Sequence, residues 1–154
     1  MNKERENTIV LTQAGLERLN QLISQTEQRL RELAKWLPDA PALSPAHEEY
    51  YLESIKLKKL IETRRNARIV NNDEAAQLGI GLHFKIMDVS TGEAEEYKIT
   101  TPFESDPTEG KISYQSPLAK SIIGHKEGEI LELPTQEGPK KLKILSITTN
   151  HNSL

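Results

Sequence analysis

The sequence predicts an α+β protein in which an antiparallel coiled-coil hairpin, residues 1–74, precedes a small antiparallel-sheet domain, residues 75–154. Three observations support this fold class. Apolar residues first recur at alternating three- and four-residue steps, a proline-rich break divides that stretch, and from residue 82 the apolar period falls to two. A hydrophobic fraction of 36% is lean, which suits a chain that spends its length on an exposed hairpin.

The first helix is expected over Gln13–Trp36, with Thr12 as its N-cap and Pro38 as its end. Its apolar positions form an a/d heptad seam, which indicates a coiled coil. Thr26 occupies the one polar slot of that seam. The apolar members are Leu16, Leu19, Ile23, Leu30, Leu33 and Leu37.

The second helix is expected from Pro45 to about Val70, because Ser44 and Pro45 form a cap-and-proline helix start. Prolines at 38, 41 and 45 cannot lie together in one helix interior, so the chain reverses between the arms. Each arm then projects about 35–40 Å. Trp36, Tyr50 and Tyr51 flank the reversal and are expected to pack together there, with partner contact as the alternative.

The second domain begins after a polar, glycine-containing linker at Asn71–Gly81. A short helix, Leu118–Ile123, is expected between a Ser116-Pro117 start and a Gly124 stop. The expected strands alternate apolar and polar residues; they are Leu82–Met87, Glu95–Thr101, Lys111–Tyr114, Glu129–Leu133 and Leu142–Ile147.

Charge is distributed unevenly along the hairpin. Residues 38–54 contain Asp39, Glu48, Glu49 and Glu53 and no lysine or arginine. A basic stretch follows, made of Lys56, Lys58, Lys59, Arg64, Arg65 and Arg68. Such a gradient is typical of a solvated helix surface. The alternative is a far end directed at cations and a basic stretch directed at nucleic-acid phosphate.

Composition and motifs argue against several function classes. Cysteine is absent, which excludes disulfides and thiolate metal sites, and no apolar run is long enough for a membrane span, so we expect a cytoplasmic protein without membrane contact. The histidines are scattered at 47, 83, 125 and 151, without metal-ligand spacing. There is no glycine-rich phosphate loop and no serine elbow, so we expect no enzyme and no metal site.

Three segments carry a resemblance to a known family. The run from Leu11 to Leu19 reads LTQAGLERL, Glu49-Tyr50 lies near the start of the second helix, and the run from Tyr114 to Gly124 reads YQSPLAKSIIG. In these segments, and over roughly residues 8–148, the chain resembles the bacterial Gre family of transcription elongation factors, GreA and GreB.

The resemblance implies a coiled coil that enters the secondary channel of bacterial RNA polymerase and a C-terminal domain of FKBP-like fold. It implies docking on the polymerase through the segment Ser116, Pro117, Leu118, Ala119 and Lys120. The basic residues between Lys56 and Arg68 would face transcript RNA or the channel wall. Bacterial RNA polymerase is therefore the expected partner, and nascent RNA is a further candidate.

The chain departs from the family at the far end of the hairpin. There the family carries an Asp-x-x-Glu-Asn segment whose carboxylates complete the coordination of the polymerase's second Mg²⁺. Leu43 and Ala46 stand at about those positions here, and neither supplies an oxygen ligand. We expect a modulatory or inhibitory regulator with no cofactor of its own and at most indirect contact with the polymerase Mg²⁺.

Three alternatives stay open. The chain could be an active transcript-cleavage factor that uses Asp39 with Glu48 or Glu49 as its candidate acids. It could be a prolyl isomerase, although fold is poor evidence for activity and the sheet domain is short of aromatic residues. It could also be a coiled-coil adaptor without polymerase contact, which the Ser116–Gly124 match argues against.

Overall fold

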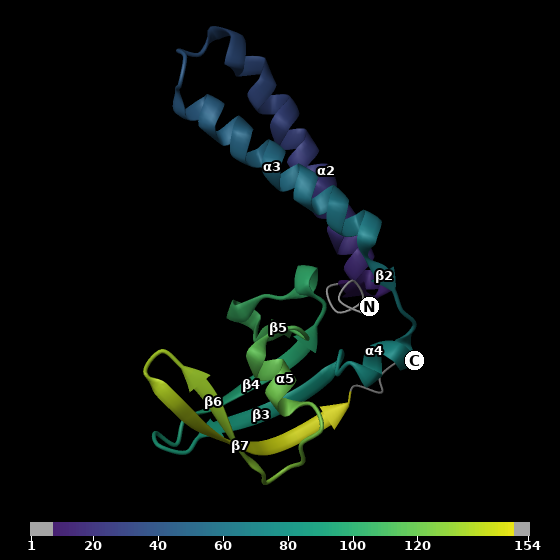
Figure 1. Ribbon diagram of the computed structural model, residues 1–154, viewed down its shortest axis with the longest axis vertical. Helices are drawn as coiled ribbons and strands as arrows, with labels where there is room; N and C mark the ends of the chain where they lie inside the picture. Colours follow the sequence, from purple (N-terminus) through teal and green to yellow (C-terminus); the bar gives the residue numbers. More distant parts are fainter. Residues whose placement is uncertain (1–7, 150–154) are drawn as a thin grey trace, which may run out of the picture. The chain divides into compact units, whose positions relative to one another are not determined.

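The computed structural model describes residues 8–149, which form two compact units that divide between Ile69 and Val70 (Figure 1). We call residues 8–69 the hairpin unit and residues 70–149 the sheet unit. The division falls before the expected boundary at 74/75, because the predicted linker contains a short helix, α4 (Asn72–Gln77). The Asn71 side chain caps it by accepting from Glu74 N at 2.9 Å, and Ala75 is buried.

The hairpin unit consists of α2 (Gln13–Trp36) and α3 (Pro45–Asn66), which run antiparallel (Figure 1). The predicted Thr12 cap is confirmed, since its hydroxyl accepts from Gly15 N at 3.1 Å. The seam is confirmed as well. Thr26 is buried within it, and its hydroxyl donates to Leu22 O at 2.8 Å, so the polar slot is satisfied inside its own helix. The other buried positions of α2 are Gly15, Leu19, Ile23 and Leu33.

The second helix ends at Asn66, so the prediction that it reaches Val70 is wrong. Ala67 is extended, with φ −67° and ψ 142°, and the chain continues as β2 (Arg68–Ile69). This strand pairs in parallel with β1 (Val10–Leu11), and Ile9 O accepts from Arg68 N at 3.0 Å. The base of the hairpin is therefore closed by backbone pairing between its two ends.

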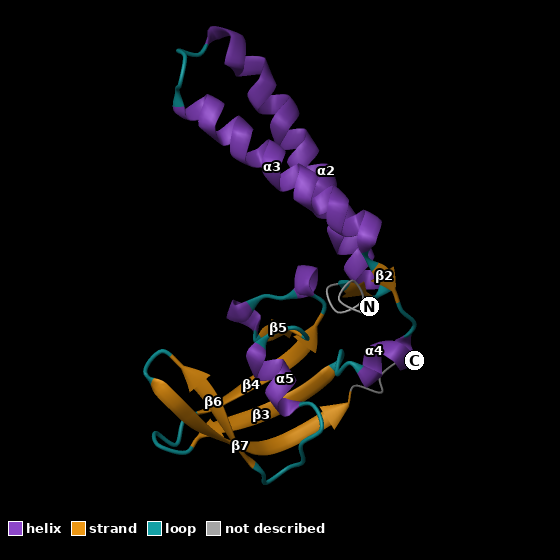
Figure 2. Cartoon of the chain, viewed as in Figure 1, coloured by secondary structure: helices purple, strands orange, loops and turns teal. Residues whose placement is uncertain are grey.

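The sheet unit holds five strands in the order β5-β4-β3-β7-β6 (Figure 2). All neighbouring pairs are antiparallel except β4 and β5, which are parallel. Two 3₁₀ turns, Pro102–Glu104 and Pro107–Glu109, make the connection that allows this parallel pairing. The strands are β3 (Leu82–Asp88), β4 (Ala94–Thr100), β5 (Lys111–Ser113), β6 (Ile130–Thr135) and β7 (Gly138–Thr149).

A short helix, α5 (Pro117–Ile122), packs against one face of the sheet and completes its core (Figure 2). The core residues are Phe84, Ile86, Ile99, Ala119, Ile122, Leu131, Leu142 and Ile144. The predicted α+β class, with a helical hairpin followed by a small sheet domain, is confirmed. No helix within residues 8–149 has the length and apolar character needed to cross a membrane.

Candidate functional site

The far end of the hairpin, residues 36–52, is called the tip. Its loop begins with a 3₁₀ turn, Leu37–Asp39, and closes through a bond from Ser44 N to Pro41 O at 3.1 Å. Leu43 lies inside that closure with φ +62°, the left-handed region that leucine rarely adopts, and its side chain is 97% exposed. Nothing in the sequence signals this conformation, because a turn position with positive φ favours glycine or asparagine.

Ser44 is the N-cap residue of α3, but its side chain forms no capping hydrogen bond. Its hydroxyl instead forms a hydrogen bond with Nδ1 of His47 at 3.1 Å, while Ser44 O accepts from His47 N at 3.0 Å. Both the side chain and the backbone amide of His47 therefore form hydrogen bonds with Ser44 at the start of the helix. No group of three or more histidine or acidic side chains placed to hold a metal ion occurs within residues 8–149.

The three candidate acids have different surroundings. Glu49 is bound by Arg29 of α2, whose Nε donates to Glu49 Oε1 at 2.9 Å and whose terminal nitrogen donates to the same oxygen. The hydrogen bonds and charge of Glu49 raise the pKa of the Arg29 guanidinium. Asp39 and Glu48 are exposed. Glu49 thus links the two helices, and the sequence did not reveal this pairing because it depends on the register across the loop.

The aromatic side chains near the loop do not pack the tip closed. Trp36 is 71% exposed and Tyr51 is 64% exposed, whereas Tyr50 is half-buried. The expectation that these three residues pack together is therefore wrong for Trp36 and Tyr51, which stand in solvent. Leu52, the next residue of α3, is also exposed, at 57%.

The basic residues do not share one face. Successive helix residues are rotated by about 100°, so Lys58 and Arg65, seven apart, lie on the same side, whereas Lys56 and Lys58 lie on roughly opposite sides. Lys59 is also exposed, and Arg64 donates to Asn20 Oδ1 at 3.1 Å. Arg68 belongs to β2 rather than to the helix.

The predicted docking segment forms the start of α5. Ser116 Oγ accepts from Ala119 N at 3.2 Å, which confirms the predicted cap. Pro117 and Lys120 are exposed, Leu118 is half-buried against the core, and Ala119 is completely buried. Of the five residues, only Pro117 and Lys120 therefore present largely free side chains, while Ala119 anchors the helix to the sheet.

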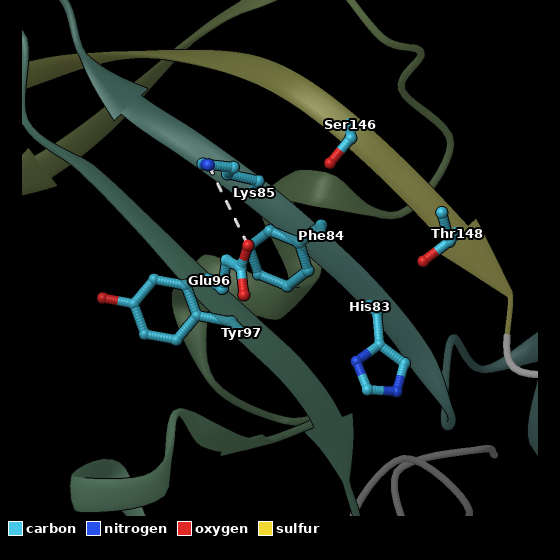
Figure 3. A pocket seen from close by; sticks show the side chains of 7 residues that line it. All are labelled: His83, Phe84, Lys85, Glu96, Tyr97, Ser146 and Thr148. Atoms are coloured by element: carbon cyan, nitrogen blue, oxygen red, sulfur yellow. Dashed lines mark ion pairs between the residues drawn. The ribbon is translucent and has the colours of Figure 1, made fainter.

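The sheet unit also has a shallow pocket of about 340 Å³ over β4, β3 and β7 (Figure 3). Five of its seven lining residues are polar or charged, the others being Phe84 and Tyr97, and Lys85 and Glu96 form a loose ion pair across it at 3.9 Å. Tyr97 stacks on Phe84 with ring centroids 5.5 Å apart, and burial together with the Glu95 carboxylate raises the pKa of Tyr97 to about 12. This polar lining is unlike the apolar pocket that a prolyl isomerase needs.

Comparison with known proteins gives a consistent result. The family model described as "Transcription elongation factor, GreA/GreB, C-term" matches residues 73–149. The transcription inhibitor protein Gfh1 of Thermus aquaticus is 31% identical over 150 residues, which cover 90% of this chain and 96% of Gfh1. Transcription elongation factor GreA of Acetivibrio thermocellus is 31% identical over 159 residues, 95% of this chain and 97% of GreA.

Among solved structures, Gfh1 of Thermus thermophilus matches with 27% identity over 92% of this chain and 99% of that chain, at a TM-score of 0.42.

Proposed function

Because the chain belongs to the GreA/GreB family of transcription elongation factors, we propose that it regulates transcription elongation by binding bacterial RNA polymerase at the secondary channel. It acts on the polymerase and is not itself an enzyme. The mode of regulation is inhibitory or modulatory. One observation carries this choice. The tip has Leu43 and Ala46 at about the positions where the resemblance to the family implies two carboxylates.

The chemistry of the tip supports inhibition. A second Mg²⁺ at a polymerase centre needs added oxygen ligands in near-octahedral geometry, and leucine and alanine side chains have none to give. Glu49, the third candidate acid, is paired with Arg29 of α2. The chain therefore fills the channel without completing a metal site and has no cofactor of its own. Gfh1 of Thermus aquaticus, which aligns with this chain over 96% of its own length, is named a transcription inhibitor.

The two units divide the work of binding. The hairpin supplies reach, since α2 has 24 residues and rises 1.5 Å per residue, giving a length of about 36 Å. The exposed Pro117 and Lys120 at the start of α5 supply a docking contact. The exposed cations of α3 face the channel wall or nascent RNA from more than one side of the helix. This distribution fits a hairpin that its partner surrounds better than a hairpin that lies on a flat surface.

The experiment adds the purified full-length chain to backtracked elongation complexes and follows transcript length and the rate of nucleotide addition. We expect shortening no faster than with buffer, and slower nucleotide addition when the chain is in excess. A Lys120→Glu variant tests docking, with Lys141→Glu, another exposed lysine, as the matched charge reversal on β7. Slowing should need at least about tenfold more Lys120→Glu protein, equivalent to about 1.4 kcal/mol, and no more of the control.

Two outcomes would contradict the proposal. Transcript shortening that is lost in Asp39→Ala or Glu48→Ala would show an active cleavage factor with a rebuilt acid pair. Failure of the wild-type chain to bind polymerase at all would remove the polymerase as partner.

A further inference from the structure

The tip gathers the exposed apolar side chains of the hairpin unit. Within residues 8–69, four of the five large apolar side chains that are exposed lie in the tip, and the fifth, Ile69, lies at the base. Between the tip and the base, the exposed side chains of α2 and α3 are mainly polar and charged. Single exposed apolar residues are ordinary, whereas a concentration at one end of an element marks an interaction site. We call these four residues the apolar tip: Trp36, Leu43, Tyr51 and Leu52.

Leu43 adds a second, independent observation. It holds a left-handed backbone conformation that is unfavourable for leucine, and its side chain packs on nothing in the chain, being 97% exposed. Glycine or asparagine would fit the same turn with less strain. The leucine side chain therefore contributes little to the fold of the tip and is available for a contact outside the chain.

Charge indicates what kind of surface the tip meets. Residues 36–55 include no lysine or arginine, and Asp39 and Glu48 are exposed beside the loop. This anionic rim repels nucleic-acid phosphate. It complements a protein surface that has an apolar centre and a basic border, and tryptophan and tyrosine are the residues most enriched at the centres of such interfaces.

We propose that the apolar tip docks on an apolar, basic-rimmed protein surface of RNA polymerase within the channel. The tip inhibits the polymerase through this contact and does not coordinate a metal ion there. The inference rests on the proposed function, because the channel brings the tip to that surface. The inference goes beyond the proposed function because it names the side chains that inhibit and the kind of polymerase surface that they contact.

The first test replaces the apolar side chain and keeps the turn. Leu43→Asn is close in size and tolerates the left-handed conformation, so the hairpin should stay folded. Ala42→Gly is the matched control, since it changes the neighbouring loop residue without touching the apolar tip. We expect Leu43→Asn to need at least about tenfold more protein for half-maximal slowing of nucleotide addition, equivalent to about 1.4 kcal/mol, and Ala42→Gly to stay within about twofold of wild type.

The second test identifies the surface. Tyr51, which is 64% exposed, is replaced by the photo-crosslinker p-benzoylphenylalanine in the full-length chain bound to an elongation complex. Crosslinking to a polymerase subunit, at a peptide rich in apolar and basic residues, is the expected result. Crosslinking to the transcript would replace the inference with RNA stacking, and crosslinking to a second copy of the chain would replace it with self-association.

Failure of the inference is distinct from failure of the proposed function. If wild type binds polymerase and slows it, and Leu43→Asn does so equally well, the apolar tip has no inhibitory role although the proposed function stands. If wild type does not bind polymerase, both are overturned.

Discussion

Gly110 offers a test of how tightly the parallel β4–β5 pair is built. It follows the 3₁₀ turn Pro107–Glu109 with φ +71°, and its carbonyl accepts from Lys98 N at 2.8 Å. A Cβ added there would lie 2.7 Å from the backbone oxygen of Glu96. That oxygen belongs to β4, which is paired on its other side to β3, so it cannot move away without disturbing the sheet.

Gly92 is the matched control for Gly110. Its φ is +77°, almost the same, but a Cβ there meets nothing within 4 Å. Gly92→Ala should therefore cost only the left-handed penalty, about 1 kcal/mol. Gly110→Ala should cost that amount and a further 1–3 kcal/mol, roughly, for overpacking against a backbone atom. For a unit of this size the additional loss corresponds to roughly 4–8 °C in Tm for each kcal/mol.

The measurement is hydrogen exchange of the β4 amides in the full-length chain, followed by mass spectrometry, because it reports the sheet unit separately from the hairpin. Exchange should be faster in Gly110→Ala than in Gly92→Ala under the same conditions. Equal acceleration in the two variants would refute the reasoning, since it would mean that the close approach to Glu96 can relax without cost.

Three further predictions concern α5, the basic residues and acid stability. Ser116→Ala removes the cap of α5 and should destabilise the sheet unit by about 1 kcal/mol in chemical denaturation, whereas Ser116→Asp, which keeps an acceptor, should restore it; equal loss in both variants would contradict the capping role. Charge reversal at Lys58 together with Arg65 should reduce the salt dependence of polymerase binding if the two contact phosphate, and an unchanged salt slope would leave them as solvated surface. Thr108 donates its hydroxyl and its amide to Asp106, which holds the Asp106 pKa below its ordinary value of 3.8. A depressed carboxyl pKa stabilises the fold above the unfolded pKa and loses that contribution as pH falls through the folded value, so Asp106→Asn should unfold less steeply with acid below about pH 4, and an identical acid profile would contradict this assignment.

The sequence predicted those features whose causes are local. The caps at Thr12 and Ser116 each depend on a hydroxyl that reaches an amide three residues ahead, and both were found from residue type and position alone. The seam through Leu19, Ile23 and Leu33 follows from helix period, which is also local. The alternation of Phe84 and Ile86 in β3 placed them in the core for the same reason.

Features that depend on distant pairing were missed. The strand Arg68–Ile69 exists because it pairs with β1, which precedes α2 in the chain, and a two-residue stretch with one charged and one apolar side chain cannot signal that pairing. The Arg29–Glu49 contact depends on the length and shape of the loop between them. Trp36 flanks the chain reversal, and large aromatic residues are usually buried, so packing was expected there, whereas Trp36 is 71% exposed.

The organisation of the hairpin explains why the tip can hold strained and exposed residues. All of α3 is described, and none of its residues is fully buried, so the helix pair depends on the seam of α2 and on the β1–β2 closure at the base. Little packing reaches the tip, and an exposed ion pair such as Arg29–Glu49 adds little stability. The shape of the tip is therefore set by its backbone. Prolines 38, 41 and 45 restrict the unfolded chain, and the turn closed from Ser44 N to Pro41 O fixes the loop. A tip defined by its backbone leaves its side chains free to change, so the hairpin can keep its shape with leucine at 43 and alanine at 46.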